Sequence, residues 1–476
     1  MIRLGIVLYN TLTGRKEPFD TIEPGKVRFY ACGPTVYDLF HLGNARMFVV
    51  FDTVRRYLEY RGYEVRYVQN FTDVDDKIIA RAISSGKDVR TVANENIQAY
   101  FHDAKQLGVE EADVHPRVTE SMSDIIRFID DLVRQGHAYE QNGDVYFDTS
   151  TFPTYGKLSH QSVEDLRAGF RIEVNTEKRD PTDFALWKSV KPGEEYWESP
   201  WGPGRPGWHI ECSVMNLKYL GEQIDIHAGG RDLVFPHHEN EIAQSEAHSG
   251  KQFARYWLHN GTLNINGEKM SKSLGNFITA REVLDKRPGR AVRYYLLSAQ
   301  YRHPLNYTEE GMEQAVQAME RFDACLRNLA HRSNALDELP DFAKSPGVDE
   351  GKTFKTVESI RDDFVRAMDD DFNTADGITA IHEAVREANA YLLQTQVTKK
   401  GLTAFSSLIR ELMNALGLVE KEDVSRADEE ILKLVEEREL ARKNRNFARA
   451  DAIRDELLTR DIVIEDTAHG SRWYRK

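Results

Sequence analysis

The sequence of 476 residues has few cysteines, no long apolar run and an excess of acidic residues. Its three cysteines, Cys32, Cys212 and Cys325, are too few and too scattered for a disulfide framework, which favours a reducing cytoplasm. No stretch approaches the ~20 apolar residues of a membrane span, and the N-terminus lacks a small-residue cleavage site. The net charge of −14 argues against coating nucleic acid through bulk charge, although a local basic patch is compatible with it. We therefore expect a soluble cytoplasmic protein without membrane contact.

The N-terminal region alternates between strand and helix patterns. Val27–Ala31 and Val65–Phe71 have the composition of buried strands, and Asn44–Arg61 between them repeats apolar residues at helical spacing. A strand, a helix and a second strand within about 45 residues predict a βαβ unit with parallel strands. The fold class expected for this half is therefore α/β with a Rossmann-type parallel sheet.

Two short motifs indicate phosphate chemistry. The first, Pro34–Asn44, directly follows the first predicted strand and leads through a glycine-bearing turn into the helix. Such a turn points backbone N–H groups at a phosphate. The second motif, Glu268–Ser273, is a polar segment with two lysines, Lys269 and Lys272, that can approach the same phosphates from another side. The plain alternative for these lysines is an ordinary exposed loop.

Four residues form a candidate metal set: Cys32, Cys212, His237 and Glu241. His237 and Glu241 are four apart in a predicted helix, Pro236–Ser249, so they share a face, whereas the residue four beyond His238 is apolar. Two thiolates, an imidazole and a carboxylate make a chemically sound tetrahedral zinc set. No C-x-x-C element is present, so the pattern leaves open two ordinary buried cysteines and a His–Glu pair on a helix surface.

The rest of the chain departs from the strand–helix alternation. A predicted helix, Ser123–Gln135, and a hairpin around Asn142-Gly143 indicate an insertion, and the pattern after Thr308 is almost wholly helical. Near the C-terminus a helix pair, Asp428–Arg460, precedes a small hairpin around His469-Gly470. The predicted division is a nucleotide-binding catalytic domain of residues 1–115 and 207–307, a connective insertion of residues 116–206, a helical bundle of residues 308–423 and a mixed α/β domain of residues 424–476.

Basic residues gather in the predicted C-terminal domain. Within Arg438–Arg449 they are opposed only by Glu439, and the chain ends in a segment that contains Arg472 and Trp473. A basic segment with nearby aromatics can bind nucleic acid, whereas the plain alternative is a solvated helix face.

The two phosphate motifs resemble the signatures of class I aminoacyl-tRNA synthetases, His41-Leu-Gly-Asn44 and Lys269-Met-Ser-Lys-Ser273. Further segments are similar to cysteinyl-tRNA synthetases of bacterial type, and the resemblance runs from end to end. These segments are Tyr30–Asp38, Gly204–Ser213, Phe235–Gln244, Met368–Thr374 and Gly470–Lys476.

The resemblance implies ATP-dependent attachment of L-cysteine to tRNA(Cys) through a cysteinyl-adenylate, with Mg²⁺ accompanying ATP, by an enzyme expected to be a monomer. In that family zinc is bound by residues that correspond here to Cys32, Cys212, His237 and Glu241, and the metal binds the thiolate of the substrate. An apolar pocket that distinguishes a thiol from a serine hydroxyl gives only ~10–200-fold discrimination, and a coordinate bond to sulfur can give more. This role fits a chain with no obvious editing domain.

The resemblance also implies roles for single residues. Catalytic and ATP-binding roles fall on His41, Gly43, Asn44, Lys269 and Lys272. The amino acid would be enclosed by Thr72, Trp208 and Asp232, with Asp232 as partner of its ammonium group. Core packing is the alternative for Trp208. Contacts with tRNA would come from Arg442, Arg445 and Trp473. Asn44 stands where the family often has histidine, and asparagine can donate a hydrogen bond but carries no positive charge.

Two other functions are compatible with parts of the sequence. A ligase that passes activated cysteine to an amino-sugar would share the zinc and both phosphate motifs, but it would have little use for the helical region and the basic tail. A synthetase-like module that binds tRNA without catalysis would be expected to lack Lys272 or a metal ligand, and both are present.

Overall fold

The computed structural model describes residues 5–162, 178–191, 194–270, 276–337, 350–419, 426–460, 462–467 and 470–475. The chain forms two compact units. The first comprises Met1–Val316, Arg366–Asp376 and Ala415–Gly417, and the second comprises Gln317–Val365, Gly377–Asn414 and Leu418–Lys476. Within the described residues no helix is both long enough and apolar enough to cross a bilayer.

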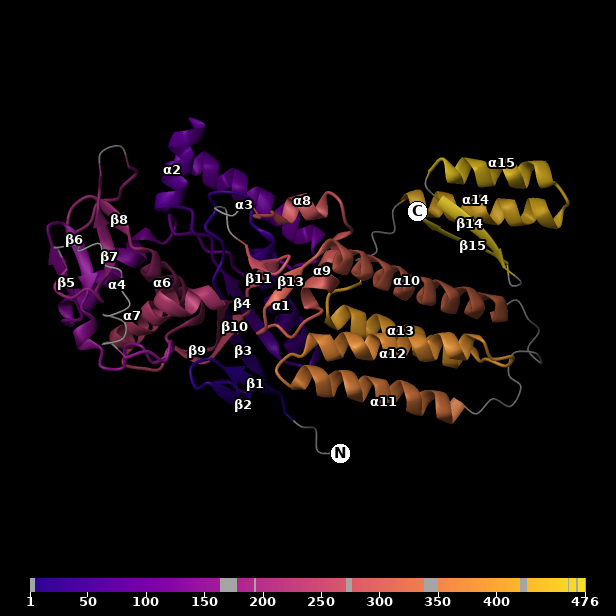
Figure 1. Ribbon diagram of the computed structural model, residues 1–476, viewed down its shortest axis with the longest axis horizontal. Helices are drawn as coiled ribbons and strands as arrows, with labels where there is room; N and C mark the ends of the chain where they lie inside the picture. The colour runs from indigo at the N-terminus through magenta and orange to yellow at the C-terminus, as the bar shows by residue number, and fades with distance from the viewer. Residues whose placement is uncertain are drawn as a thin grey trace. The chain divides into compact units, whose positions relative to one another are not determined.

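A four-stranded parallel sheet forms the centre of the first unit (Figure 1). Its strands, in spatial order, are β10 (Ala254–Asn260), β9 (Ile224–Gly230), β3 (Lys26–Ala31) and β4 (Glu64–Gln69). Helix α1 (Leu42–Tyr60) connects β3 to β4, so the predicted βαβ unit and the α/β fold class are confirmed. The sheet order places β3 between β4 and β9, which brings their carboxyl ends to one edge of the sheet.

Helix α1 is buried over most of its surface because its sequence is apolar nearly all round. The one acidic residue in its middle, Asp52, is paired with Arg56 at 2.7 Å and with the fully buried Arg293 at 2.5 Å. Arg293 also donates to the backbone carbonyls of Leu416 and Gly108. These contacts satisfy a buried charge pair, as such pairs require, and hold the start of α1 in a fixed position.

The chain between β4 and β9 contains helices and a second, antiparallel sheet. After α2 (Asp76–Ser85) and α3 (Val89–Gln106) come α4 (Met122–Arg134) and the sheet, whose strands are β5 (Ala138–Gln141), β6 (Asp144–Phe147), β7 (Phe184–Ser189) and β8 (Gly204–Pro206). Asn142 and Gly143 join β5 to β6 with φ values of 55° and 87°, the left-handed conformation of a two-residue hairpin loop. The predicted helix and hairpin are therefore confirmed, and the domain boundaries stay a prediction.

Two helices on one side of the parallel sheet carry most of the polar residues considered below. Helix α6 (Trp208–Leu220) packs against β3, β4 and α7 (Glu239–Ser249). A π-helical turn, Val234–His238, precedes α7. The remaining elements of the first unit are β1 (Val7–Asn10), β2 (Arg15–Pro18), β11 (Leu263–Ile265), β12 (Glu268–Lys269), α8 (Ala280–Leu284), α9 (Gly289–Leu297) and β13 (Leu305–Tyr307).

The second unit is mainly helical, as the sequence predicted. Its long helices are α10 (Glu309–Asp337), which begins in the first unit, α11 (Glu350–Asp369), α12 (Thr374–Leu392) and α13 (Lys399–Ala415). The predicted C-terminal helix pair and hairpin are α14 (Arg426–Lys443), α15 (Phe447–Leu458), β14 (Ile462–Thr467) and β15 (Gly470–Arg475). A small core of Ile431, Val435, Ile453, Leu457 and Ile462 joins them.

Candidate functional site

The candidate site lies at the carboxyl ends of the parallel strands, where open α/β sheets bind their ligands. Cys32 directly follows β3, Thr72 lies just beyond the end of β4, and Asp232 lies in a short helical turn after β9. Helix α6 contributes Trp208 and Cys212 from its first turns. The parallel topology therefore brings together residues that are up to 200 positions apart.

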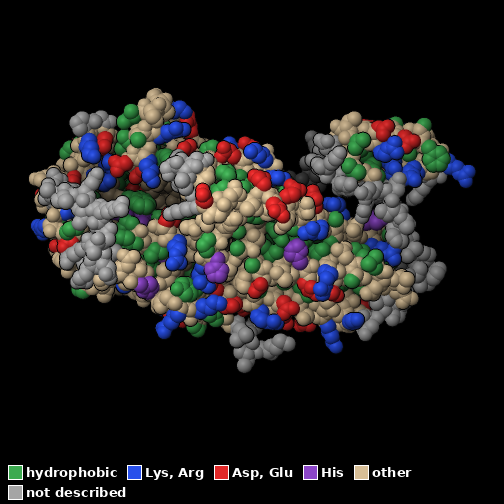
Figure 2. All heavy atoms as spheres, in the orientation of Figure 1, with side chains coloured by type: hydrophobic (Ala, Val, Ile, Leu, Met, Phe, Trp, Pro, Cys, Tyr) green, Lys and Arg blue, Asp and Glu red, His purple; other side chains and the backbone are tan. Residues whose placement is uncertain are grey.

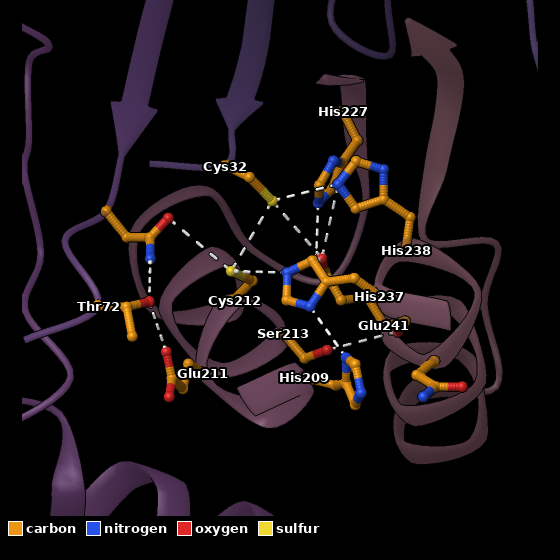
Figure 3. A network of polar contacts seen from close by, with 12 residues as sticks. Cys32, Thr72, His209, Glu211, Cys212, Ser213, His227, His237, His238 and Glu241 are labelled. Atoms are coloured by element: carbon orange, nitrogen blue, oxygen red, sulfur yellow. Dashed lines mark hydrogen bonds and ion pairs between the residues drawn. The ribbon is translucent and has the colours of Figure 1, made fainter. Parts of the chain in front are cut away.

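The four predicted metal ligands form one buried cluster, which Figure 3 shows from close by. The two sulfur atoms of Cys32 and Cys212 lie 3.9 Å apart, and Cys212 Sγ lies 3.6 Å from His237 Nε2. Glu241 Oε1 lies 3.7 Å from Cys32 Sγ and 3.1 Å from His237 Nε2. Tetrahedral zinc, with Zn–S near 2.3 Å and Zn–N near 2.0 Å, separates two sulfurs by about 3.8 Å and a sulfur from a nitrogen by about 3.5 Å. The donor set and its spacing therefore fit zinc.

A second group of potential ligands shares Cys32 and Glu241 with the first and adds His227 and His238. His227 Nε2 lies 2.8 Å from Glu241 Oε2, and His238 Nε2 lies 3.2 Å from Cys32 Sγ. The first of these distances is that of a hydrogen bond and is too short for two ligands of one ion. His227 thus orients the carboxylate of Glu241, as residues around a metal site commonly do.

His238 links the metal cluster to further polar residues. Its Nδ1 lies 2.8 Å from His259 Nε2, and His259 Nδ1 lies 2.8 Å from the hydroxyl of Thr11. The sequence favoured His237 over His238 as a ligand because the residue four beyond His238 is the apolar Ile242. His227 and His259 were missed because they lie on β9 and β10, and only the sheet register brings them beside the ligands.

Burial sets the protonation states of the cluster in the absence of a cation. It holds the pKa of His237 well below its usual range, so this imidazole is neutral and its lone pair is available to a metal. Burial, together with neighbouring Cys212 and Glu241, raises the pKa of the Cys32 thiol, and burial raises that of Glu241. Without a cation the thiol and the carboxyl are therefore protonated. A bound dication favours their ionised forms instead, so metal binding would release protons here.

The three predicted amino-acid-binding residues differ in exposure and in their contacts with this cluster. Trp208 is 37% exposed, and its ring stacks on the ring of His237 with centroids 4.1 Å apart. Its exposed side is available to a ligand, so core packing does not describe it. Asp232 is exposed, whereas Thr72 is buried. Trp208 thus contacts one of the ligands directly, and Thr72 is linked to Cys212 through the side chain of Asn70.

Glu211 was missed by sequence reasoning. It is fully buried beside Cys212, and its Oε2 accepts a hydrogen bond of 2.8 Å from the hydroxyl of Thr72. Burial raises the pKa of Glu211 well above its usual range. The only signal in the sequence was its position next to a candidate ligand. A glutamate at such a position can equally be an exposed residue of a helix.

The first phosphate motif forms the N-terminus of α1. His41 is the N-cap residue, and its Nδ1 accepts the backbone N–H of Asn44 at 3.1 Å. A neutral His41 therefore carries its proton on Nε2 and can donate it outward. A Cβ on Gly43 would lie 3.0 Å from the His41 ring and 3.3 Å from Met270 Cε. The glycine thus leaves room for His41 and for a residue of the second motif.

The second phosphate motif is described only in part. Lys269 is the last residue of β12, which pairs with β11, but its side chain lies outside the described residues. Lys272 also lies outside them. Their predicted roles therefore rest on the sequence.

The predicted tRNA contacts lie in and around the turn between α14 and α15. Arg442 and Arg445 are exposed there, and Figure 2 shows basic side chains, drawn in blue, over this part of the chain. Arg438 is buried, and Arg449 is paired with Glu437 at 2.8 Å, so the exposed basic segment is shorter than the sequence indicated. Trp473 lies in β15, and its side chain is outside the described residues.

An exposed aromatic residue beside these arginines was missed. Phe447, the first residue of α15, is 60% exposed. An exposed ring next to exposed arginines is the arrangement that binds unpaired bases.

Three family profiles match successive parts of the chain. Residues 18–317 match the class I (C) tRNA synthetase catalytic domain, residues 363–420 match the DALR domain, and residues 425–474 match the cysteinyl-tRNA ligase anticodon binding domain.

Curated relatives are similar over almost the whole chain. The cysteine–tRNA ligase of Geobacillus sp. strain WCH70 is 55% identical over 470 residues, which cover 99% of each chain. That of Anoxybacillus flavithermus strain DSM 21510 / WK1 is 53% identical over 472 residues, covering 99% of this chain and 100% of the relative.

Solved structures share the fold at low sequence identity. Methionyl-tRNA synthetase from Mycobacterium tuberculosis, in complex with methionyl-adenylate, superposes with a TM-score of 0.62 at 15% identity and covers 83% of this chain and 90% of its own. A leucyl-tRNA synthetase from Agrobacterium radiobacter K84, in a ternary complex, gives 0.59 at 13% identity and covers 84% of each chain.

Proposed function

Because the chain belongs to the cysteine–tRNA ligase family of class I aminoacyl-tRNA synthetases, we infer that it attaches L-cysteine to tRNA(Cys) at the expense of ATP. The reaction has two steps: the cysteine carboxylate attacks the α-phosphate of ATP and releases pyrophosphate, and the 3′ ribose of the tRNA then takes the cysteinyl group. The observation that carries this function is the cluster of Cys32, Cys212, His237 and Glu241 at the edge of the sheet, with zinc-like spacing.

The cluster would hold zinc through two sulfurs, one imidazole nitrogen and one carboxylate oxygen. When bound, zinc supplies a Lewis acid that prefers a soft sulfur ligand to a hydroxyl oxygen. Selection of cysteine over serine then depends on the thiol itself. His227 keeps the carboxylate of Glu241 in place through their contact of 2.8 Å.

The surrounding residues would orient the amino acid. Asp232 is an exposed carboxylate next to the site and is the natural partner of an ammonium group. Trp208 presents the face of its ring beside His237 and excludes water from one side. The hydroxyl of Thr72 donates a hydrogen bond to Glu211, so its oxygen can accept a hydrogen bond from a substrate N–H.

The start of α1 would bind the phosphates of ATP, which arrives with Mg²⁺. Backbone N–H groups and the positive end of the helix dipole favour an anion there. His41 donates from Nε2, and Asn44 donates without adding charge. Lys269 and Lys272 would neutralise charge that develops on the phosphates during adenylate formation.

The C-terminal elements would bind tRNA. The exposed Arg442 and Arg445 would meet phosphates, and Phe447 and Trp473 would stack on unpaired bases. The match of residues 425–474 to an anticodon-binding profile supports this assignment. A monomeric state, a cytoplasmic location and the four-part domain division stay predictions.

The test is ATP–pyrophosphate exchange with each of the twenty amino acids, together with metal analysis. We expect exchange that depends on cysteine and about one zinc per chain, since four ligands of this kind bind strongly. Exchange with another amino acid, or with none, would contradict the assignment. A chain ending near Glu420 should retain exchange but charge tRNA poorly; a full-length chain that charges no tRNA would favour the amino-sugar ligase.

A further inference from the structure

Tyr30 lies on the strand that ends at the metal cluster. It precedes Cys32 by two positions on β3, so the two side chains lie on the same face of the sheet. In the sheet register Tyr30 is the partner of His227 on β9, and their rings lie 5.2 Å apart. The side chain of Tyr30 is completely buried. The phenol is therefore buried next to the residues of the metal cluster.

The hydroxyl of Tyr30 has no hydrogen-bond partner among the described residues. Other buried tyrosines differ in this respect: Tyr155 donates to Asn240 Oδ1 at 2.5 Å, and Tyr301 donates to Asp371 Oδ1 at 3.0 Å. Tyr30 packs in the same buried cluster as Cys32 and Cys212, and burial, followed by the charges of Cys212, Cys32 and Glu241, raises the pKa of its hydroxyl. A buried polar group without a partner requires an explanation, and a metal centre beside it is one.

The two cysteines differ in the donors around them. Cys32 Sγ has the ring nitrogen of His238 at 3.2 Å. Cys212 Sγ has the side-chain oxygen of Asn70 at 3.8 Å, and that oxygen accepts the backbone N–H of Gly33 at 2.9 Å. A protonated thiol can give its weak S–H to such an oxygen, but a thiolate needs a donor. A hydrogen bond to an ionised acceptor is also stronger than one to a neutral acceptor.

We propose that Tyr30 is a positioning residue of the metal centre, whose hydroxyl donates a hydrogen bond to the Cys212 thiolate when metal is bound. This inference rests on the proposed zinc site. The hydrogen bond holds the sulfur in place and withdraws electron density from it. Zinc then receives less charge from Cys212 and stays a stronger acceptor for the thiolate of the substrate.

The first experiment compares the zinc affinity of the unsubstituted protein with that of Tyr30→Phe by competition with a chelator. We expect the dissociation constant of zinc to rise about 10–100-fold, the usual effect of losing such a supporting contact. Tyr301→Phe is the matched control, because it removes a hydrogen bond from a buried tyrosine outside the cluster. It should leave zinc affinity unchanged.

Thermal unfolding separates a role toward the metal from simple packing. In chelator-treated protein, Tyr30→Phe should leave the midpoint unchanged or raise it, because it removes a buried hydroxyl without a partner. In zinc-loaded protein the same change should lower the midpoint. Tyr301→Phe should lower both midpoints, because it removes a hydrogen bond that is present with or without zinc. If the hydroxyl had no role toward the metal, Tyr30→Phe would change the two midpoints alike, and that result would overturn the proposal.

Cobalt substitution gives a spectroscopic readout. Without the hydrogen bond the sulfur is richer in electrons, so the thiolate-to-cobalt charge-transfer band of Tyr30→Phe should move to lower energy. If that variant does not accumulate, 3-fluorotyrosine at position 30, a stronger donor of the same shape, should move the band to higher energy. Bands that stay in place would overturn the proposal. A wild-type chain that binds no zinc would instead remove the metal centre itself, so the two failures are distinguishable.

Discussion

The sulfur atoms of Cys32 and Cys212 lie 3.9 Å apart although the residues are 180 positions apart in the sequence. This separation is close to that of two thiolates on one tetrahedral zinc ion, about 3.8 Å. Burying two sulfurs and the Glu241 carboxylate together is costly in the absence of a cation, because each ionised form loses its hydration. The contact is therefore the structural basis for the metal and substrate assignments.

Gly43→Ala should slow adenylate formation a few-fold. The new Cβ would lie 3.0 Å from the His41 ring, so the ring must shift by a few tenths of an ångström. A displacement of about 1 Å in a catalytic group costs about 100-fold in rate, and a smaller shift costs correspondingly less. Pyrophosphate exchange measures the effect, and Gly5→Ala is the control, since nothing lies within 4 Å of its Cβ. Equal rates in the two variants would show that the site tolerates a side chain at position 43.

Lys272→Ala should lower the rate of adenylate formation by orders of magnitude and leave cysteine binding largely intact. The charge of this lysine is needed most when the phosphates rearrange, so the loss should appear in kcat more than in KM. Single-turnover exchange and a direct measurement of cysteine binding separate the two effects. An unchanged exchange rate would remove Lys272 from the mechanism.

Phe447→Ala should raise the KM for tRNA and leave cysteine-dependent pyrophosphate exchange unchanged. Stacking of one base on an aromatic ring is worth ~1–3 kcal/mol, which corresponds to a change of about 5–150-fold. Leu458→Ala is the matched control, because Leu458 is a similarly exposed apolar residue at the other end of α15. If both variants charge tRNA like the full chain, Phe447 has no role in tRNA binding.

Acidification should destabilise the first unit through His115. Its Nε2 accepts the backbone N–H of Ala112 at 3.0 Å, and its Nδ1 lies 2.9 Å from the carbonyl oxygen of Gln69, so both contacts suit the neutral ring. Burial lowers the pKa of His115 from 6.5 to about 4. Because the unfolded chain takes up the proton first, this stability is present above pH 6.5 and is lost as the pH falls from 6.5 toward 4. The loss is about 3 kcal/mol.

Denaturant titrations between pH 7 and pH 4 measure this contribution. His115→Gln should show a shallower loss of stability with falling pH than the full chain. His102→Gln, at an exposed histidine, should retain the slope of the full chain. A parallel pH dependence in all three proteins would contradict the assignment to His115.

The fold was predictable where the local pattern is strong. The strand before Cys32, the helix after Gly43 and the turn at Asn142 each follow from periodicity or from turn residues, and each is confirmed. These elements depend on neighbouring residues, which a sequence displays directly.

The surroundings of the site were not predictable in the same way. His227 contacts Glu241 because the turn after β9 leads back into α7, and Tyr30 shares a buried cluster with Cys212 because α6 packs on β3. Such contacts are set by sheet order and helix packing, which no local pattern records. The burial of Arg438 shows the same limit, since its basic neighbours indicated an exposed face.

X-ray absorption at the zinc edge, with and without L-cysteine, tests the central claim most directly. The zinc-loaded chain should show two sulfur neighbours from Cys32 and Cys212, and addition of L-cysteine should increase this number to three, whereas L-serine should not. Cys325→Ser should give the same spectra, because Cys325 lies on α10, in the second unit. A sulfur number that stays at two with L-cysteine, or spectra that change with Cys325→Ser, would contradict selection of the substrate thiolate by this centre.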